Sequence, residues 1–184
     1  MIVEFDPYDS EVTKFRRKVL AEVDTGQVRE WFTDKEFYKT DIDSIWLYYH
    51  EGESVAFVGG THFNDKLYRT TQRYYILEEA RRKNVNTVHF MPNGFMDAQI
   101  KRAKELNCDG AFLSIHCFDD RHIRLFDYMK NDVVGVRMMK NEDRQYTAKD
   151  FQFLDKEYRI KSVDQKIIFH PLKDGATFEE CYLG

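Results

Sequence analysis

The sequence has few of the residues that mark secreted or metal-stabilised proteins. It contains three cysteines and three prolines in 184 residues. Three is an odd number and no C-x-x-C spacing occurs, so neither a disulfide framework nor a cysteine-based zinc site is indicated. We therefore expect Cys108, Cys117 and Cys181 to be reduced thiols.

Long apolar runs are also missing. No segment approaches the roughly 18 consecutive apolar residues that would span a bilayer. Residues 1–6 lack the basic stretch and apolar run of a secretion signal. These absences predict a cytoplasmic protein that does not associate with a membrane.

No charge of one sign dominates the chain. It has 28 Lys and Arg against 32 Asp and Glu, a net charge of −4, which argues against disorder and against general attraction to DNA or RNA. No Gly-, Ser- or Pro-rich linker interrupts it, so we expect a single domain over residues 1–184. The six histidines include no H-x-x-x-H or H-E-x-x-H spacing, so we expect no metal.

The amino-terminal part of the chain has the apolar spacing of helices. Ser10 is the expected cap of a helix whose apolar residues recur at intervals of three, four and seven, and Gly26 is its expected end. A second short helix is expected over residues 27–32.

Three β-rich runs follow. They cover residues 45–50, 55–58 and 66–77, and Glu51 and Gly52 form a tight turn between the first two. Together they predict an antiparallel meander.

The second half alternates helices and strands. A helix over residues 95–106 precedes an apolar strand over residues 109–116, and this connection predicts that the strand is parallel to the end of the 66–77 strand. Asp119 or Asp120 is expected to cap a further helix. Strands are expected over residues 151–160 and 165–172. The order indicates an α/β (α+β) fold with a mixed, mostly antiparallel central sheet and helices on both faces.

This order resembles the GNAT N-acyltransferase fold over nearly the whole chain. The family's signature, V-x-P-x-x-R-x-x-G-x-G/A, meets the segment ILEEARRKNVN that starts at Ile76. The signature arginine is kept at Arg81, whereas Glu78 replaces its proline and Asn84 and Asn86 replace its two glycines. Asparagine tolerates positive φ better than other non-glycine residues. Short members encoded by tailed phages are similar in this region.

A second family motif, N-x-x-A-x-x-L-Y, meets residues 121–128, where Tyr128 alone matches. Residues 88–94 form an extra stretch before the 95–106 helix. Either the cofactor loop is longer than usual, with Asn93 and Gly94 opening the helix, or a helix begins near residue 87 and breaks at Pro92. We favour the longer loop.

The resemblance implies an enzyme that transfers an acyl group from acetyl-CoA, or another acyl-CoA, to a small-molecule or protein amine. Tyr128 would protonate the leaving thiolate and Glu78 or Glu79 would take the amine proton. Helix-start N–H groups and nearby cations would bind the CoA pyrophosphate. The implied cofactor-binding residues are Ile76, Leu77, Arg81, Arg82, Lys83, Asn84, Asn86, Asn93, Gly94 and Ser114.

Each assignment has a structural alternative. The basic run at residues 81–83 is also typical of a solvated surface turn, and Tyr128 is also typical of a ring packed on a core with its hydroxyl in water. A GNAT-shaped binding or assembly module without catalysis is the rival function, which the lost glycines and the 15 Phe and 11 Tyr would suit. The aromatic residues also leave a homodimer open.

Overall fold

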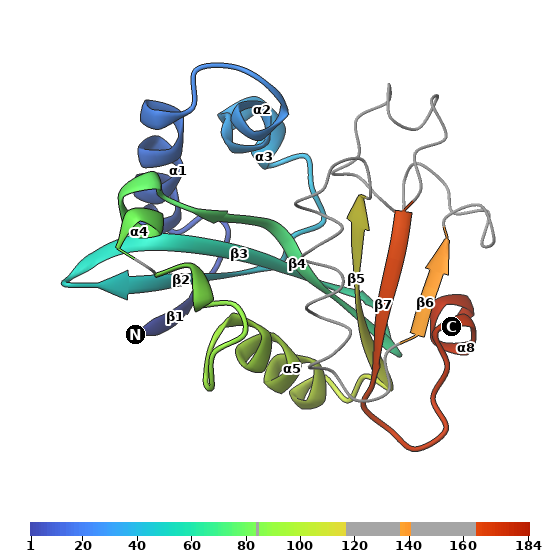
Figure 1. Cartoon of the computed structure of the whole chain (residues 1–184). Helices are drawn as coiled ribbons and strands as arrows, with labels where there is room; N and C mark the ends of the chain where they lie inside the picture. The colour runs from blue at the N-terminus through green and yellow to red at the C-terminus, as the bar shows by residue number, and fades with distance from the viewer. Residues whose placement is uncertain (84, 117–136, 141–164) are drawn as a thin grey trace. The chain divides into compact units, whose positions relative to one another are not determined.

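The computed structural model describes residues 1–83, 85–116, 137–140 and 165–184 (Figure 1). They form two compact units. The first contains Met1–Thr61 and Thr70–Arg102, and the second contains His62–Arg69 and Ala103–Gly184. The single domain expected over the whole chain stays a prediction.

Seven strands among the described residues are hydrogen-bonded in the order β1-β2-β3-β4-β5-β7-β6. The pairs β1–β2, β2–β3, β5–β7 and β6–β7 are antiparallel, and β4–β5 is parallel. The predicted mixed, mostly antiparallel sheet is therefore confirmed. The strands are β1 Ile2–Phe5, β2 Ser44–His50, β3 Glu53–Asn64, β4 Leu67–Ile76, β5 Gly110–His116, β6 Arg137–Lys140 and β7 Gln165–Pro171.

The parallel pair joins only the beginnings of its two strands. Leu67, Tyr68 and Arg69 pair with Gly110, Ala111 and Phe112. The parallel direction confirms the prediction. However, β5 pairs with the start of β4, whereas we expected it beside the end of that strand.

The first helix, α1 (Ser10–Glu22), is capped by Asp9 and not by Ser10, because Asp9 Oδ1 accepts from Glu11 N at 2.9 Å. Gly26 does not end α1, which stops four residues earlier. It precedes α2 (Gln27–Phe32) with a φ of +96°, a conformation that favours glycine. The second predicted helix is confirmed, and α3 (Asp34–Phe37) follows it.

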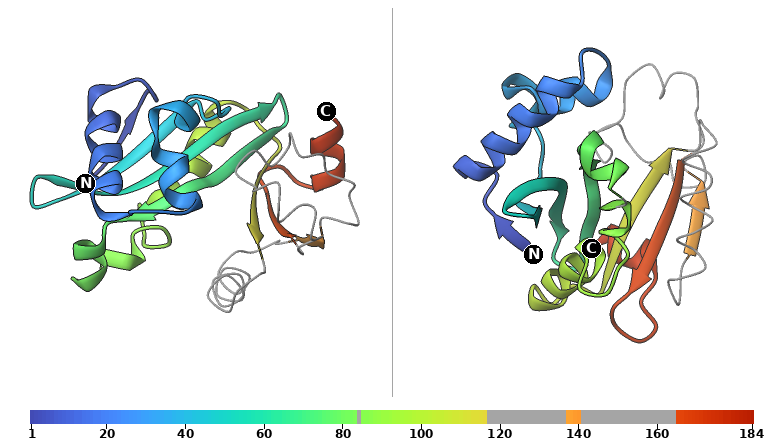
Figure 2. Two further views of the ribbon diagram at one scale, coloured as in Figure 1. Left: turned by 90° about the horizontal axis from the view of Figure 1, so that it is seen from above. Right: turned by 60° about the vertical axis from the view of Figure 1, so that its left-hand side comes forward.

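In the first unit, α1, α2 and α3 lie on one side of the strands and α5 (Phe95–Glu105) begins on the other (Figures 1 and 2). Helices on both faces were predicted. An aromatic core fills the α1 side, where the rings of Phe15 and Phe32 lie 5.6 and 5.2 Å from that of Phe57. All three phenylalanines are fully buried.

The turn between β2 and β3 is the expected tight one. Glu51 and Gly52 both have positive φ, +51° and +82°, as a two-residue type I′ hairpin requires. After β4 come α4 (Glu78–Arg82) and the 3₁₀ turn η1 (Val85–Thr87). No helix runs from residue 87 to 95, so the longer-loop interpretation agrees with the structure.

The second unit has its own core of buried residues from β4, β5, β7 and α8 (Phe178–Leu183). Phe178 contacts the rings of Phe112 and Phe169 at 5.2 and 5.9 Å. Neither α8 nor β6 was predicted. The helix expected after Asp119 or Asp120 and the strand over 151–160 lie outside the described residues. The buried core residues are Leu67, Phe112, Phe169, Phe178 and Cys181.

Candidate functional site

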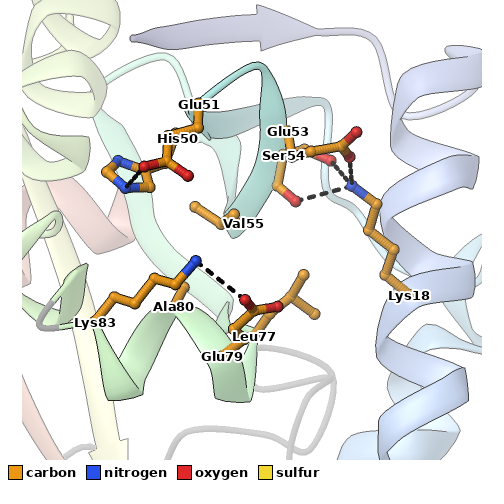
Figure 3. Close-up of a pocket in the computed structure, with 10 residues that line it drawn as sticks. All are labelled: Lys18, His50, Glu51, Glu53, Ser54, Val55, Leu77, Glu79, Ala80 and Lys83. Atoms are coloured by element: carbon orange, nitrogen blue, oxygen red, sulfur yellow. Dashed lines mark hydrogen bonds and ion pairs between the residues drawn. The ribbon is translucent and has the colours of Figure 1, made fainter.

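A pocket of about 370 Å³ opens in the first unit, where α1, the β2–β3 turn and α4 approach one another (Figure 3). Three separate stretches of the sequence supply its wall. Its lining residues are Lys18, His50, Glu51, Glu53, Ser54, Val55, Leu77, Glu79, Ala80 and Lys83.

The charges of this pocket are paired across its rim. Lys18 Nζ lies 2.7 Å from Glu53 Oε2 and 3.1 Å from the Ser54 carbonyl oxygen, and this ammonium lowers the pKa of Glu53. Lys83 Nζ lies 3.0 Å from Glu79 Oε1, which raises the pKa of Lys83. Figure 3 shows both pairs beside the apolar part of the pocket. Because these side chains reach water, a charged ligand could exchange with either partner.

The local structure explains why α4 brings only part of the predicted basic run to the pocket. Arg82 Nη2 lies 2.6 Å from Glu78 Oε1, one helical turn away. Arg81 points toward α1, where its Nη2 lies 3.9 Å from Glu22 Oε2 and its guanidinium lies over the ring of Tyr75. Each cation of the run therefore has a carboxylate beside it. Lys83 lines the pocket, whereas Arg81 and Arg82 do not.

The second candidate site is the amino end of α5. Asn93, with a φ of +58°, and Gly94 immediately precede the helix. Phe95 N donates to the carbonyl oxygen of Val88 at 3.0 Å, and Met96 N donates to that of His89 at 2.9 Å. The loop thus uses the N–H groups that a helix start ordinarily offers to an anion.

A buried polar cluster lies beneath this helix end. His89 Nε2 lies 3.1 Å from Thr71 Oγ1. Thr71 N donates to Gln99 Oε1, and Gln99 Nε2 donates to the Gly59 carbonyl oxygen. Burial lowers the pKa of His89 to about 3, so the imidazole is neutral at pH 7. The cluster links β3, β4, α5 and the loop before α5.

The remaining predicted positions are scattered. Ile76 is the last residue of β4 and is buried, and Leu77 N donates to the Val55 carbonyl oxygen at the pocket. Asn86 lies in η1 and Ser114 in β5, opposite Ile167. Two predicted residues, Asn84 and Tyr128, lie outside the described residues. Among the predicted residues, the pocket brings together Leu77, Glu79 and Lys83.

The described part of the chain contains neither a cluster of metal ligands nor a helix suited to cross a membrane. No group of three or more His, Cys, Asp and Glu side chains in residues 1–83, 85–116, 137–140 and 165–184 is arranged to hold a metal ion. No described helix has both the length and the apolar character needed to cross a bilayer.

Sequence comparisons do not place the chain, because no protein-family model and no curated protein matches it. Solved structures do match. The ribosomal-protein-S18-alanine N-acetyltransferase from Escherichia coli superposes with a TM-score of 0.55 at 11% identity, covering 97% of this chain and 100% of the other. An acetyltransferase of the GNAT family from Staphylococcus aureus gives 0.54 at 16%, covering 94% and 100%. The aminoglycoside 6′-N-acetyltransferase from Enterococcus faecium gives 0.53 at 13%, covering 96% and 99%.

The chain has the GNAT fold. At such low identities the match establishes the fold, not the activity. The segment that aligns with the GNAT signature runs from the last residue of β4 through α4 into η1. Eight residues lie between its last position, Asn86, and the first residue of α5. In this GNAT-fold chain residues 88–94, not the signature segment, lead directly into α5.

The amino end of α5 does not fit the pyrophosphate of CoA, which the resemblance places at a helix start. A pyrophosphate needs free N–H donors or cations. The N–H groups of Phe95 and Met96 already donate to the carbonyl oxygens of Val88 and His89. The cations of residues 81–83 have carboxylate partners, but these cations are exposed and the pairs do not by themselves exclude an anion. The loop therefore leaves the N–H groups of Phe95 and Met96 unavailable to an anion.

Sequence reasoning missed the partners of both sites. Lys18, His50 and Glu53 join the pocket from positions 30 to 65 residues before Lys83, and no local motif marks them. His89 and Gln99 are 2% and 0% exposed, but a single histidine and a single glutamine carry no spacing signal. The extra stretch before α5 was the one usable clue to the loop.

Proposed function

We propose that the chain is an N-acyltransferase that moves an acyl group from a thioester donor, acetyl-CoA or another acyl-CoA, to an amine. The fold is the observation that supports this most strongly, because β4, α5 and β5 form a parallel crossover in the GNAT order. Two structural relatives are named for N-acetylation of a protein alanine and of an aminoglycoside. Protein and small-molecule amines are thus both candidate acceptors.

The reaction has simple requirements. The amine nitrogen forms the new C–N bond while the C–S bond of the thioester breaks. A protonated amine loses one proton to a base before it attacks, and its nitrogen loses a second as the amide forms. The departing thiolate gains one proton from an acid.

We propose Glu79 as the base and the pocket as the acceptor site. Glu79 lines the pocket, whereas Glu78 is not among its lining residues and pairs with Arg82. A protonated amine could replace Lys83 as the partner of the Glu79 carboxylate and then lose its proton to it. The proposed acid remains Tyr128, because a tyrosine phenol, with a reference pKa of about 10, can protonate a leaving thiolate.

Release of free thiol in the presence of a panel of amines tests the activity. Glu79→Gln should lower the turnover roughly 100-fold, as loss of a general base does. Glu78→Gln is the matched control and should stay within about twofold of the wild type. Equal losses in both variants would remove Glu79 from the proposed role.

Tyr128→Phe tests the acid, because it keeps the ring and removes only the proton. We expect turnover to fall roughly 100-fold while donor binding stays close to wild type. If the wild type releases no thiol with any amine and donor thioesters do not raise its melting temperature, the acyltransferase proposal fails. The binding or assembly module would then be the better interpretation.

A further inference from the structure

The amino end of α5 is closed by the segment that precedes it. Phe95 N and Met96 N donate to the carbonyl oxygens of Val88 and His89 at 3.0 and 2.9 Å. The first N–H groups of a helix have no partner within the helix and ordinarily bind a side chain, water or an anion. Here two of them bind the backbone of the same chain.

Residue 94 has to be a glycine for this closure. A Cβ at Gly94 would lie 2.3 Å from the Val88 carbonyl oxygen and 2.7 Å from that of Met91. Val88 and His89 are themselves buried. The loop is therefore pressed directly onto the helix start, and an anion could not reach the two N–H groups without displacing it.

The buried side chain of His89 holds the loop in place. Its ring lies 4.8 Å from that of Tyr74 and 4.6 Å from that of Phe90, and its Nε2 is hydrogen-bonded to Thr71. Lifting residues 88 and 89 away from α5 would withdraw this ring from its aromatic surroundings. The buried side chain thus opposes opening of the helix end.

The charges at this end also disfavour an anion. Asp97, in the first turn of α5, accepts from Asn93 N through Oδ2 at 2.8 Å. Its carboxylate occupies the place where the helix dipole favours negative charge. A pyrophosphate would meet a carboxylate there.

We infer that residues 88–94 are a built-in cap that excludes the pyrophosphate of the acyl donor from the amino end of α5. The donor is therefore recognised by its thioester and pantetheine part, and its nucleotide half adds little. The identity of the donor rests on the proposed function, whereas the closure of the helix end does not.

The first test compares acetyl-CoA with S-acetylpantetheine, which lacks the nucleotide. We expect kcat/KM values within about threefold of each other, and no inhibition by millimolar adenosine 3′,5′-bisphosphate. A preference for acetyl-CoA of tenfold or more, together with inhibition by the bisphosphate, would overturn the inference.

The second test observes the helix end itself. In amide-resolved NMR of the whole chain, Phe95 and Met96 should exchange slowly with solvent and should not shift when CoA or adenosine 3′,5′-bisphosphate is added. A saturable shift of both amides with either ligand contradicts a closed end.

A double variant tests the basic run. Arg81→Ala with Arg82→Ala should change the affinity for CoA by less than twofold. Arg17→Ala with Lys35→Ala, two exposed cations elsewhere in the first unit, controls for the altered net charge. A tenfold loss confined to the first pair would show that the nucleotide is held there after all.

The two proposals fail separately. No transfer from either donor, with Phe95 and Met96 protected and unshifted, rejects the acyltransferase and retains the cap. Transfer from acetyl-CoA but not from S-acetylpantetheine, with both amides shifted, rejects the cap and retains the acyltransferase.

Discussion

The two candidate sites of the first unit satisfy their polar groups in opposite ways. In the pocket, Lys83 and Glu79 pair through side chains that are 51% and 81% exposed. At the amino end of α5, Phe95 N and Met96 N pair with the backbone carbonyls of Val88 and His89, which are both buried. The first arrangement is held by flexible side chains in water, and the second by packed backbone.

This difference decides which site can accept a ligand. An exposed ion pair contributes little to stability, so either partner can turn to a ligand at small cost. A buried backbone hydrogen bond can be broken only by moving the loop and desolvating its polar groups. Charged residues near a helix start are thus insufficient to predict an anion site, because the chain can satisfy the helix end itself.

Among these changes, Gly94→Ala should have the largest effect, because it destabilises the closed amino end of α5. The added methyl group meets backbone oxygen at 2.3 Å and must push the loop away from α5. We expect a loss of roughly 3 kcal/mol in the free energy of unfolding, the upper range for overpacking. Urea unfolding measures it, and NMR should show faster exchange of the Phe95 and Met96 amides.

Gly175→Ala is the control for this variant. Gly175 has a φ of +75° but open space around its Cβ, so the change strains only the local backbone, by about 1 kcal/mol. It should leave the α5 amides protected. Equal stability losses in the two variants, or unchanged exchange at Phe95 in Gly94→Ala, would contradict the closed helix end.

A fall in pH should lower the free energy of unfolding through the buried His89. The pKa of His89 is about 3 in the folded chain and 6.5 ordinarily, so the unfolded chain takes up a proton at a higher pH. This contribution to stability is fully present above pH 6.5 and is lost as the pH falls from 6.5 toward 3. Between pH 7 and 5 the loss is about 2 kcal/mol.

His89→Gln removes the titrating group while keeping a polar side chain near Thr71. Urea unfolding at several pH values should show a clearly smaller slope for this variant between pH 7 and 5. His170, whose pKa burial also lowers, is present in both proteins, so the difference between them isolates His89. Parallel pH profiles would show that His89 can charge without unfolding.

Lys83→Met should have the smallest effect on stability. It tests the exposed ion pair of the pocket. The ion pair is exposed, so we expect no measurable change in urea unfolding. Under the proposed function, Glu79 would lose its competing cation, and KM for a cationic amine should fall about fivefold. Lys39→Met, which removes a similar exposed pair with Glu36 on another helix, should leave KM unchanged.

Local interactions explain which parts of the fold were predictable. The Glu51-Gly52 turn was predictable because a two-residue turn depends on the φ preferences of those two residues alone. Helix α2 and the meander were predictable from short-range spacing. Asp9 and Ser10 are both good caps, and only the backbone path into α1 decided between them. The capping residue Thr177 could have marked α8, since its hydroxyl accepts from Glu180 N.

The sequence was sufficient to predict helices α1 and α2, the strands β2 to β4, the parallel crossover to β5 and the extra chain before α5, because these depend on periodicity and connection length. Tertiary structure decided that this loop folds back onto the helix and that Lys18 and Glu53 meet α4 at one pocket. The pocket contacts join residues far apart in the chain, whereas the loop contacts join residues seven positions apart. They depend on packing and on which polar groups remain to be satisfied, and no local spacing encodes either.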